Sequence, residues 1–189
     1  MRPRLVTGAL ILLVSVGSGP RTDDRHLLPS LSLRIMNHAQ LSSETLQRAA
    51  QEVSIIYRVA GIATTWVEAS PSSRPGNASV DIALMSDALA ETHVRQRGFR
   101  HDDLGYAIRA ARRAYIFCRH IHDIEIEFSR DPGEVLGLVI AHEVGHLLLP
   151  DDAHSAHGIM RTTFDLRSRQ RPYFSGAESG LLLARLGRP

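Results

Sequence analysis

An apolar segment between Asp131 and Pro150 constrains the fold of this chain more than any other feature. Asp131 can cap a helix, Pro132 and Glu134 occupy favoured positions in its first turn, and Pro150 cannot continue it. The apolar residues between these limits occupy most of the circumference of the helix. A helix of this kind is typically buried on most sides, so we expect it to lie in the middle of a domain.

Polar side chains interrupt this helix in the pattern His142-Glu143-Val144-Gly145-His146. Successive helical residues are about 100° apart, so positions four apart differ by only about 40° and both imidazoles project from one face. Two imidazoles on one face can share a metal ion. Glu143 lies beside them, where its carboxylate can act as a general base on a water at the metal without being a ligand.

The same pattern can arise by chance in roughly 2 to 3% of chains with this histidine and glutamate content. An accidental motif, however, would bury two imidazoles and a carboxylate without partners, which costs about 1 to 3 kcal/mol for each group. A metal ion would supply the missing partner. We therefore predict one catalytic zinc ion bound by His142 and His146.

A catalytic zinc normally has three protein ligands and one open position, so a third ligand is required. The segment after Pro150 offers four candidate side chains, which are Asp151, Asp152, His154 and His157. Of these, His157 is the weakest candidate and is expected to be exposed.

The segment from His142 to Met160 resembles the metzincin zinc peptidases, in which a third ligand follows the metal-binding helix and a methionine turn lies beneath the metal. The residues Gly158-Ile159-Met160 match that turn. The resemblance therefore implies that Met160 lies beneath the zinc. The His-Ser pair at the start of the segment that leads to Met160 is similar to the matrix-metallopeptidase branch.

The chain departs from the metzincin pattern near the third ligand, where Leu149 replaces the usual glycine and Asp152 the usual histidine. Either Asp152 is the ligand in the usual register, or the turn contains two extra residues and His154 is the ligand. We favour His154, since neutral imidazole is a common zinc ligand and Pro150 with two aspartates can form the longer turn. Tyr173 could stabilise an oxyanion, as a tyrosine does in some metzincins, but packing is the simpler expectation.

The rest of the chain predicts a mixed α/β fold: a twisted, mainly parallel sheet of about four or five strands, a backing helix, the zinc helix and a C-terminal helix. Strands are expected at Leu31–Ile35, Ile62–Glu68 and Val80–Leu84, with a strand pair at Tyr106–Arg109 and Arg113–Cys118. Helices are expected from Ser42 or Ser43 to Gly61 and from about Ser175 onward. The segment His122–Phe128 fits either a strand or a helix.

Residues 1–20 have the layout of a secretory signal peptide, with Arg2 and Arg4 before an apolar run from Leu5 to Val16. This run is well short of the roughly 20 residues that a membrane-spanning helix needs. An uncleaved anchor is the alternative, because no clear cleavage site follows the run. We expect a secreted or otherwise extracytoplasmic protein, periplasmic in a Gram-negative bacterium, with a linker at 21–30 and one domain at 31–189.

The composition is that of a soluble globular domain, with 43% hydrophobic and 22% charged residues in a chain of 189. All 22 basic residues are arginines, and 20 acidic residues nearly balance them, so we expect no nucleic-acid partner. Cys118 is the only cysteine and cannot form an internal disulfide; we expect a buried thiol.

The resemblance implies that the chain hydrolyses peptide bonds, with zinc polarising the scissile carbonyl and Glu143 taking a proton from the attacking water. The expected partner is a peptide or protein substrate that lies extended along an edge strand. The protein is expected to be a monomer with no stable membrane insertion once the signal is removed. Two alternatives differ in class: an inactive zinc-binding module that holds a partner, with a closed site that includes both Asp152 and His154, and a structural protein that binds no metal.

Overall fold

The computed structural model describes residues 28–69, 76, 78–97, 104–150 and 153–187. The expected signal peptide at 1–20 and most of the linker at 21–30 lie outside the described residues, as do Asp151 and Asp152. Within the described ranges, no helix is both long and apolar enough to cross a membrane.

The described residues form a five-stranded sheet combined with five α-helices. The strands are β1 (Ser30–Asn37), β2 (Ala63–Glu68), β3 (Ser79–Met85), β4 (Gly105–Ile108) and β5 (Arg113–Phe117). The helices are α1 (Ser43–Val59), α2 (Asp87–Arg97), α3 (Cys118–Phe128), α4 (Pro132–Leu148) and α5 (Gly176–Leu186), with a short 3-10 helix η1 (Arg109–Ala111) after β4. The strand order is β2-β1-β3-β5-β4, and β4 is the antiparallel strand at one edge. The predicted mixed α/β fold with a mainly parallel sheet is therefore confirmed, and the segment that fitted either a strand or a helix forms part of α3.

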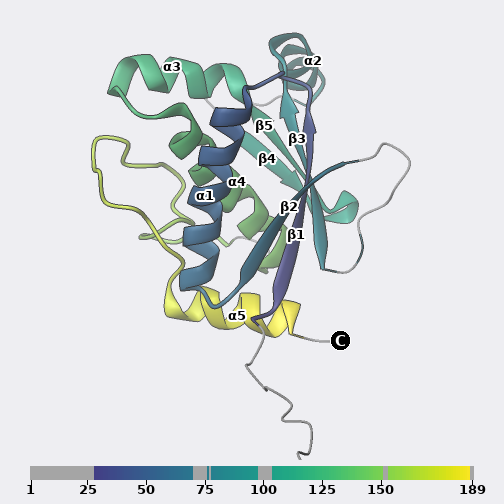
Figure 1. The fold of residues 1–189 in the computed structure, drawn as a ribbon, viewed down its shortest axis with the longest axis vertical. Helices are drawn as coiled ribbons and strands as arrows, with labels where there is room; N and C mark the ends of the chain where they lie inside the picture. The colour runs from purple at the N-terminus through teal and green to yellow at the C-terminus, as the bar shows by residue number, and fades with distance from the viewer. Residues whose placement is uncertain (1–27, 70–75, 77, 98–103, 151–152, 188–189) are drawn as a thin grey trace, which may run out of the picture.

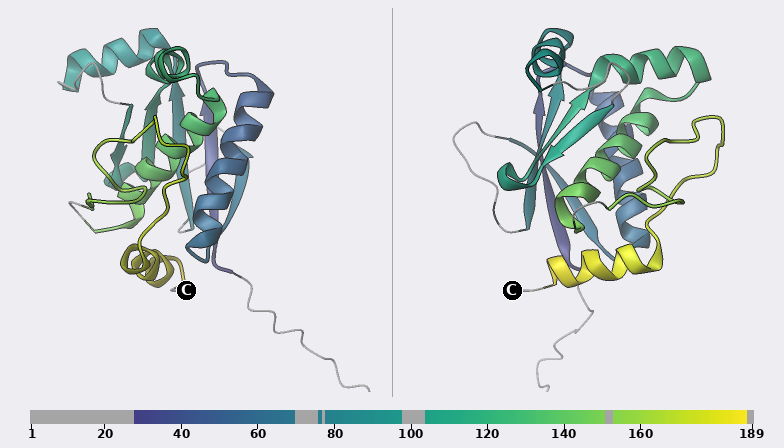
Figure 2. Two further views of the ribbon diagram at one scale, coloured as in Figure 1. Left: turned by 90° about the vertical axis from the view of Figure 1, so that its left-hand side faces the viewer. Right: turned by 180° about the vertical axis from the view of Figure 1, so that it is seen from behind.

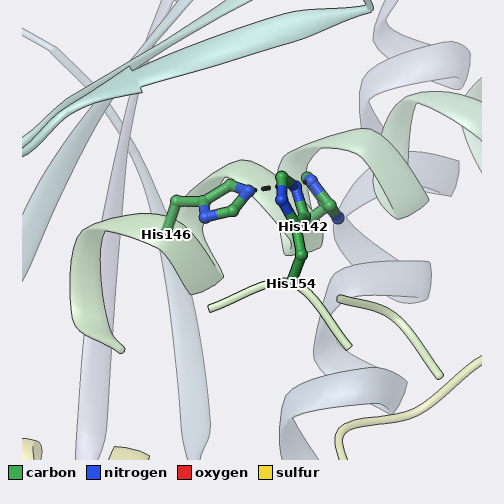
Figure 3. Close-up of side chains that lie close together, drawn as sticks. All are labelled: His142, His146 and His154. Atoms are coloured by element: carbon green, nitrogen blue, oxygen red, sulfur yellow. Dashed lines mark hydrogen bonds between the residues drawn. The ribbon is translucent and has the colours of Figure 1, made fainter. Parts of the chain in front are cut away.

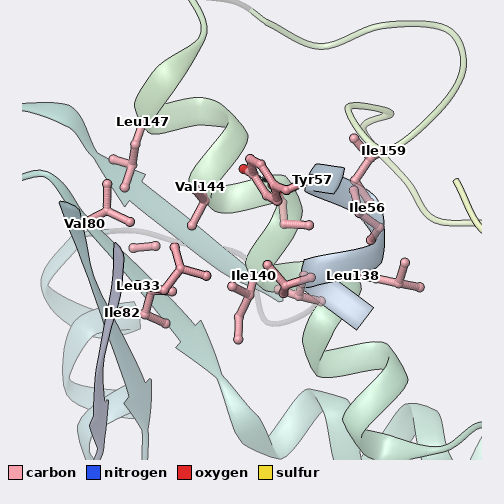
Figure 4. Packing of buried hydrophobic residues seen from close by; sticks show 14 of the residues in the cluster. Leu33, Ile56, Tyr57, Val80, Ile82, Leu138, Ile140, Val144, Leu147 and Ile159 are labelled. Carbon is pink, nitrogen blue, oxygen red and sulfur yellow. Dashed lines mark hydrogen bonds between the residues drawn. The ribbon is translucent and has the colours of Figure 1, made fainter. Parts of the chain in front are cut away.

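Helices α1 and α4 pack against each other on one face of the sheet, and α5 lies across one end of the domain (Figures 1 and 2). Alternate residues of the strands point toward these helices, as the period-2 pattern predicts. Leu33 of β1 and Ile82 of β3 are fully buried and belong to the same cluster as Ile140 and Val144 of α4 (Figure 4). The sheet covers one side of α4, and α1 covers another side. The apolar circumference of α4 is therefore buried, as expected.

Helix α4 approaches α1 closely at two glycines. A Cβ atom on Gly137 would lie 2.5 Å from the Cβ of Glu52 and 2.9 Å from the carbonyl oxygen of Ala49. A Cβ atom on Gly133 would meet the Cβ of Arg48 at the same short distance, 2.5 Å. The missing side chains let the two helices pack closely, so α1 fixes the position of α4 and of every side chain that α4 carries.

We expect Gly137→Ala to lower the free energy of unfolding by about 1 to 3 kcal/mol, because the added methyl group has no space between α1 and α4. Gly180→Ala is the matched control: Gly180 is also helical, and its added Cβ would meet nothing within 4 Å. The control should be stabilised by about 0.5 to 1 kcal/mol through helix propensity. Urea unfolding of both variants tests the close packing, which is contradicted if Gly137→Ala is as stable as Gly180→Ala.

Contacts on the sheet face opposite α4 hold the edge strand β4 in place. The rings of Tyr106 on β4 and Tyr115 on β5 stack with centroids 4.7 Å apart and planes 10° apart. The Nδ1 atom of His93, on α2, lies 2.5 Å from the Tyr106 hydroxyl oxygen. Strand β4 is therefore fixed by a side-chain cluster as well as by its ladder to β5, although it lies at the edge of the sheet.

Candidate metal centre

The imidazoles of His142, His146 and His154 form one cluster, built from the C-terminal half of α4 and the segment that follows it (Figure 3). One ring nitrogen of each histidine lies within 4.8 Å of one ring nitrogen of each of the other two histidines. His142 is buried, His146 half-buried and His154 exposed, so the cluster is reached from solvent on the His154 side. Zinc with tetrahedral bonds of about 2.0 to 2.1 Å places its ligand nitrogens about 3.3 Å apart. Small side-chain adjustments would reach that spacing, so the three imidazoles fit zinc.

A backbone carbonyl orients the His142 ring. The Nδ1 atom of His142 lies 2.8 Å from the carbonyl oxygen of Ile159, and because a carbonyl can only accept, Nδ1 donates the hydrogen bond. The Nε2 atom is then unprotonated and lies 3.0 Å from the Nε2 of His146. A carbonyl at this position is a common partner of metal-binding histidines, since it sets both the tautomer and the orientation of the ring.

The surroundings of His142 and His146 favour the neutral imidazole, which is the form that binds metal. Burial lowers the pKa of His142, and the nearby His154 lowers it further, against the hydrogen bond to Ile159 that raises it. Burial also lowers the pKa of His146 to about 4, helped by His142, His154 and Arg109. At neutral pH no proton therefore has to leave these two rings before they bind a metal ion.

These shifts predict that the metal-free protein loses stability between about pH 6.5 and 4. In this range the unfolded chain binds a proton at His146 that the folded chain does not, since its pKa falls from 6.5 to about 4 on folding. The free energy of unfolding therefore falls as the pH falls. Because His146 is only half-buried, we expect a loss of about 1 to 2 kcal/mol rather than the full effect of the shift. Urea unfolding at several pH values should show this slope. His142, whose pKa is also lowered, leaves part of it in His146→Ala, so a slope as steep in His146→Ala as in the parent would contradict its origin.

A tight turn that ends at Met160 lies against α4. Gly158 has a φ of +78°, and a Cβ there would clash with the carbonyl oxygen of Tyr173, which also accepts a hydrogen bond from the Ile159 N–H at 3.0 Å. Met160 is fully buried, and a Cβ atom on Gly145 would lie 2.5 Å from its sulfur. The same turn thus supplies the carbonyl that orients His142 and places Met160 against the histidine-bearing part of α4.

Glu143 lies between α4 and the edge strand β4. The residue is 6% exposed, and a Cβ atom on Gly105 of β4 would lie 3.1 Å from its Cγ and 3.3 Å from its carboxyl carbon. The glycine leaves room for the carboxylate beside the strand. The group of described side chains that could hold a metal ion consists of the three histidines and does not include Glu143. Glu143 is therefore a neighbour of the candidate metal site and not one of its candidate ligands.

Arg109 connects the edge of the sheet with the end of α4. It follows β4, and its Nη2 donates a hydrogen bond of 2.6 Å to the carbonyl oxygen of Pro150. The segment that leads from α4 to His154 therefore starts at a point that is fixed to the sheet.

Three of the predicted site residues, His142, His146 and His154, are brought together by the fold. The alternative ligand Asp152 lies outside the described residues, and His157 is exposed, as expected. Tyr173 is half-buried and packs against the hydrophobic core, and a role for it in stabilising an oxyanion stays a prediction.

Other residues around the site had no signal in the sequence. The Ile159 carbonyl contacts His142 from 17 residues along the chain. Phe164 packs its ring edge-on against His142 with centroids 5.4 Å apart. Arg109 approaches from the sheet. Each contact depends on tertiary structure, and none of these residue types marks a metal site by itself.

The comparisons with known proteins find similarity only among solved structures. No protein-family model matches the sequence, and a search of curated proteins finds no match either. Among solved structures, the fold is similar to that of a zinc-dependent peptidase from Methanocorpusculum labreanum, with a TM-score of 0.50 and 12% sequence identity. The similarity covers 81% of this chain and 98% of that one. At this identity the match concerns the fold.

Proposed function

We propose that this protein is a zinc-dependent endopeptidase whose metal ligands are His142, His146 and His154. The observation that carries the proposal is the group of three imidazole nitrogens within 4.8 Å of one another, next to a buried glutamate on the same helix. Three imidazoles suit zinc and leave a fourth position open, as a catalytic site requires.

We assign each side chain the role that its position supports. Zinc, when bound, supplies Lewis-acid chemistry that acidifies a water and polarises a carbonyl group. Glu143 accepts the proton of the water whose oxygen bonds to the scissile carbonyl carbon, and it passes a proton to the amine as the C–N bond breaks. His142 is held by Ile159 in the tautomer that leaves Nε2 free to bind metal.

The similar solved structure supports the activity class, because that protein is described as a zinc-dependent peptidase. We extend the proposal to a metzincin-like arrangement, with Met160 in the place of the methionine of the turn. A peptide or protein substrate would lie extended beside β4, the edge strand that borders Glu143. The proposal includes a single domain at 31–189 that acts as a monomer outside the cytoplasm after removal of residues 1–20.

The first test is the zinc content of the purified mature protein together with its activity on a mixed peptide library. We expect about one zinc per chain, and cleavage products, detected by mass spectrometry, that disappear with a chelator and return with zinc. Absence of bound zinc after reconstitution would refute the proposal. Bound zinc without cleavage of any peptide would favour a zinc-binding module without activity.

A further inference from the structure

A cavity of about 470 Å³ is lined by residues that neighbour His142, although none of the three clustered histidines lines it. Two of these residues are Leu138, one turn before His142 on α4, and Phe164, whose ring packs against His142. Gly158, in the turn that orients His142, also lines it. A side chain next to the scissile bond of a substrate could therefore enter this cavity, which has the size of ordinary ligand sites.

The charged residues that line the cavity are mostly cationic. Three arginines, Arg130, Arg161 and Arg171, line it together with one aspartate, Asp165. Asp165 is exposed and accepts a hydrogen bond from the backbone N–H of Ser168 at 3.2 Å, so this carboxylate already has a structural role.

The carboxylates that pair with two of the arginines do not line the cavity. Arg171 bonds Glu52 through Nε and Nη2, at 2.5 and 2.9 Å, and Glu52 is buried at 6% exposure. Arg130 lies 3.5 Å from Glu134, and its buried Nε has no hydrogen-bond partner among the described residues. Neither Glu52 nor Glu134 lines the cavity.

Arg161 differs from the other two arginines. It is half-buried in the cavity lining, and no hydrogen bond or ion pair engages its side chain within the part of the chain that the structure describes. It follows Met160 directly, so the buried methionine fixes its backbone next to the histidine cluster. An available guanidinium at this place can form a charge-assisted, bidentate pair with a carboxylate.

We propose that this cavity selects substrates with an acidic side chain, aspartate or glutamate, next to the scissile bond, and that Arg161 is the main determinant of the preference. This inference rests on the proposed peptidase function. It goes beyond that function in assigning a substrate class to a site formed by the segment after the methionine turn.

The test compares peptides that differ only in glutamate, glutamine or lysine at the positions directly before and after the scissile bond. At one of the two positions, kcat/KM for glutamate should exceed that for glutamine by about tenfold, the order expected for one charge-assisted hydrogen bond. In Arg161→Glu this ratio should fall to one or below, and lysine should become the preferred residue. Arg169→Glu is the matched control. Arg169 is exposed and lines a different cavity, and its substitution changes the net charge by the same amount as Arg161→Glu.

A second readout separates this inference from the proposed function. Binding of the same peptides to the zinc-loaded Glu143→Gln protein is measured by calorimetry, which does not depend on turnover. Tighter binding of the glutamate peptide, lost in Glu143→Gln/Arg161→Glu and kept in Glu143→Gln/Arg169→Glu, supports the acidic preference even if no peptide is cleaved. Equal cleavage and binding of glutamate and glutamine peptides, or a preference that survives Arg161→Glu, overturns the inference and leaves the peptidase proposal standing.

Discussion

Glu143→Gln is expected to lower kcat by roughly 10² to 10⁴-fold while the zinc content stays the same. The amide keeps the size and shape of the side chain but cannot accept a proton from the attacking water, and general bases contribute about this factor. Because Glu143 is buried between α4 and β4 and does not belong to the histidine group, the substitution should leave the metal ligands in place. Steady-state kinetics and metal analysis of the same preparation give both values.

Glu125→Gln provides the control, since Glu125 lies on α3 with an exposed side chain and its substitution removes the same charge. Surface changes of this kind have small effects, so its kcat should stay within about twofold of the parent. If Glu143→Gln retained full activity, Glu143 would have no role in proton transfer. If it lost zinc, its carboxylate would hold the metal site together rather than act on water.

The elements of the fold could be predicted where the sequence contains local signals. Helix α4 begins at the capping residue Asp131, whose side chain accepts from the Glu134 N–H at 2.9 Å, and its apolar circumference predicted its burial. The segment of α3 was ambiguous because residues 122–128 alternate as in a strand, while Ile121, Ile124 and Phe128 also fit the spacing of a helix. Packing against α4 stabilises the helical form.

The residues of the candidate site also divide into those that local sequence signals predict and those that depend on tertiary structure. His142, Glu143 and His146 were predictable because the helix alone determines their relative positions. His154 could only be favoured on chemical grounds, since the turn that carries it has no regular period. The Ile159 carbonyl could not have been predicted, because it reaches His142 only after the turn has packed against α4.

Gly145 illustrates how a local pattern can depend on a distant residue. Within the motif it is simply one of two variable positions. In the fold, the sulfur of Met160 and the ring of Phe174 occupy the space that its side chain would fill, at 2.5 and 3.2 Å from an added Cβ. The glycine and the methionine are therefore one packing unit, and together they bring the turn with the Ile159 carbonyl to His142.

His154→Ala is expected to weaken zinc binding by at least about 100-fold, more than the 10 to 100-fold typical of removing an outer-sphere partner. The prediction follows from the ring nitrogen of His154, which lies within 4.8 Å of those of His142 and His146. With only two imidazoles left, the site would lack the third protein ligand that a catalytic zinc normally has. Zinc affinity is measured by competition with a chromophoric chelator, and His157→Ala is the control because His157 is exposed and outside the cluster.

Asp152→Ala measured beside His154→Ala distinguishes the two possible registers of the ligand turn. If the turn contains two extra residues, His154→Ala loses zinc and Asp152→Ala keeps it, because the aspartate then lies outside the metal sphere. If Asp152 is the ligand in the usual metzincin register, the pattern reverses and His154 is a solvent-exposed neighbour. Loss of zinc in both variants would mean that both side chains bind the metal. Such a site would be closed to water, so it would explain zinc binding without peptide hydrolysis.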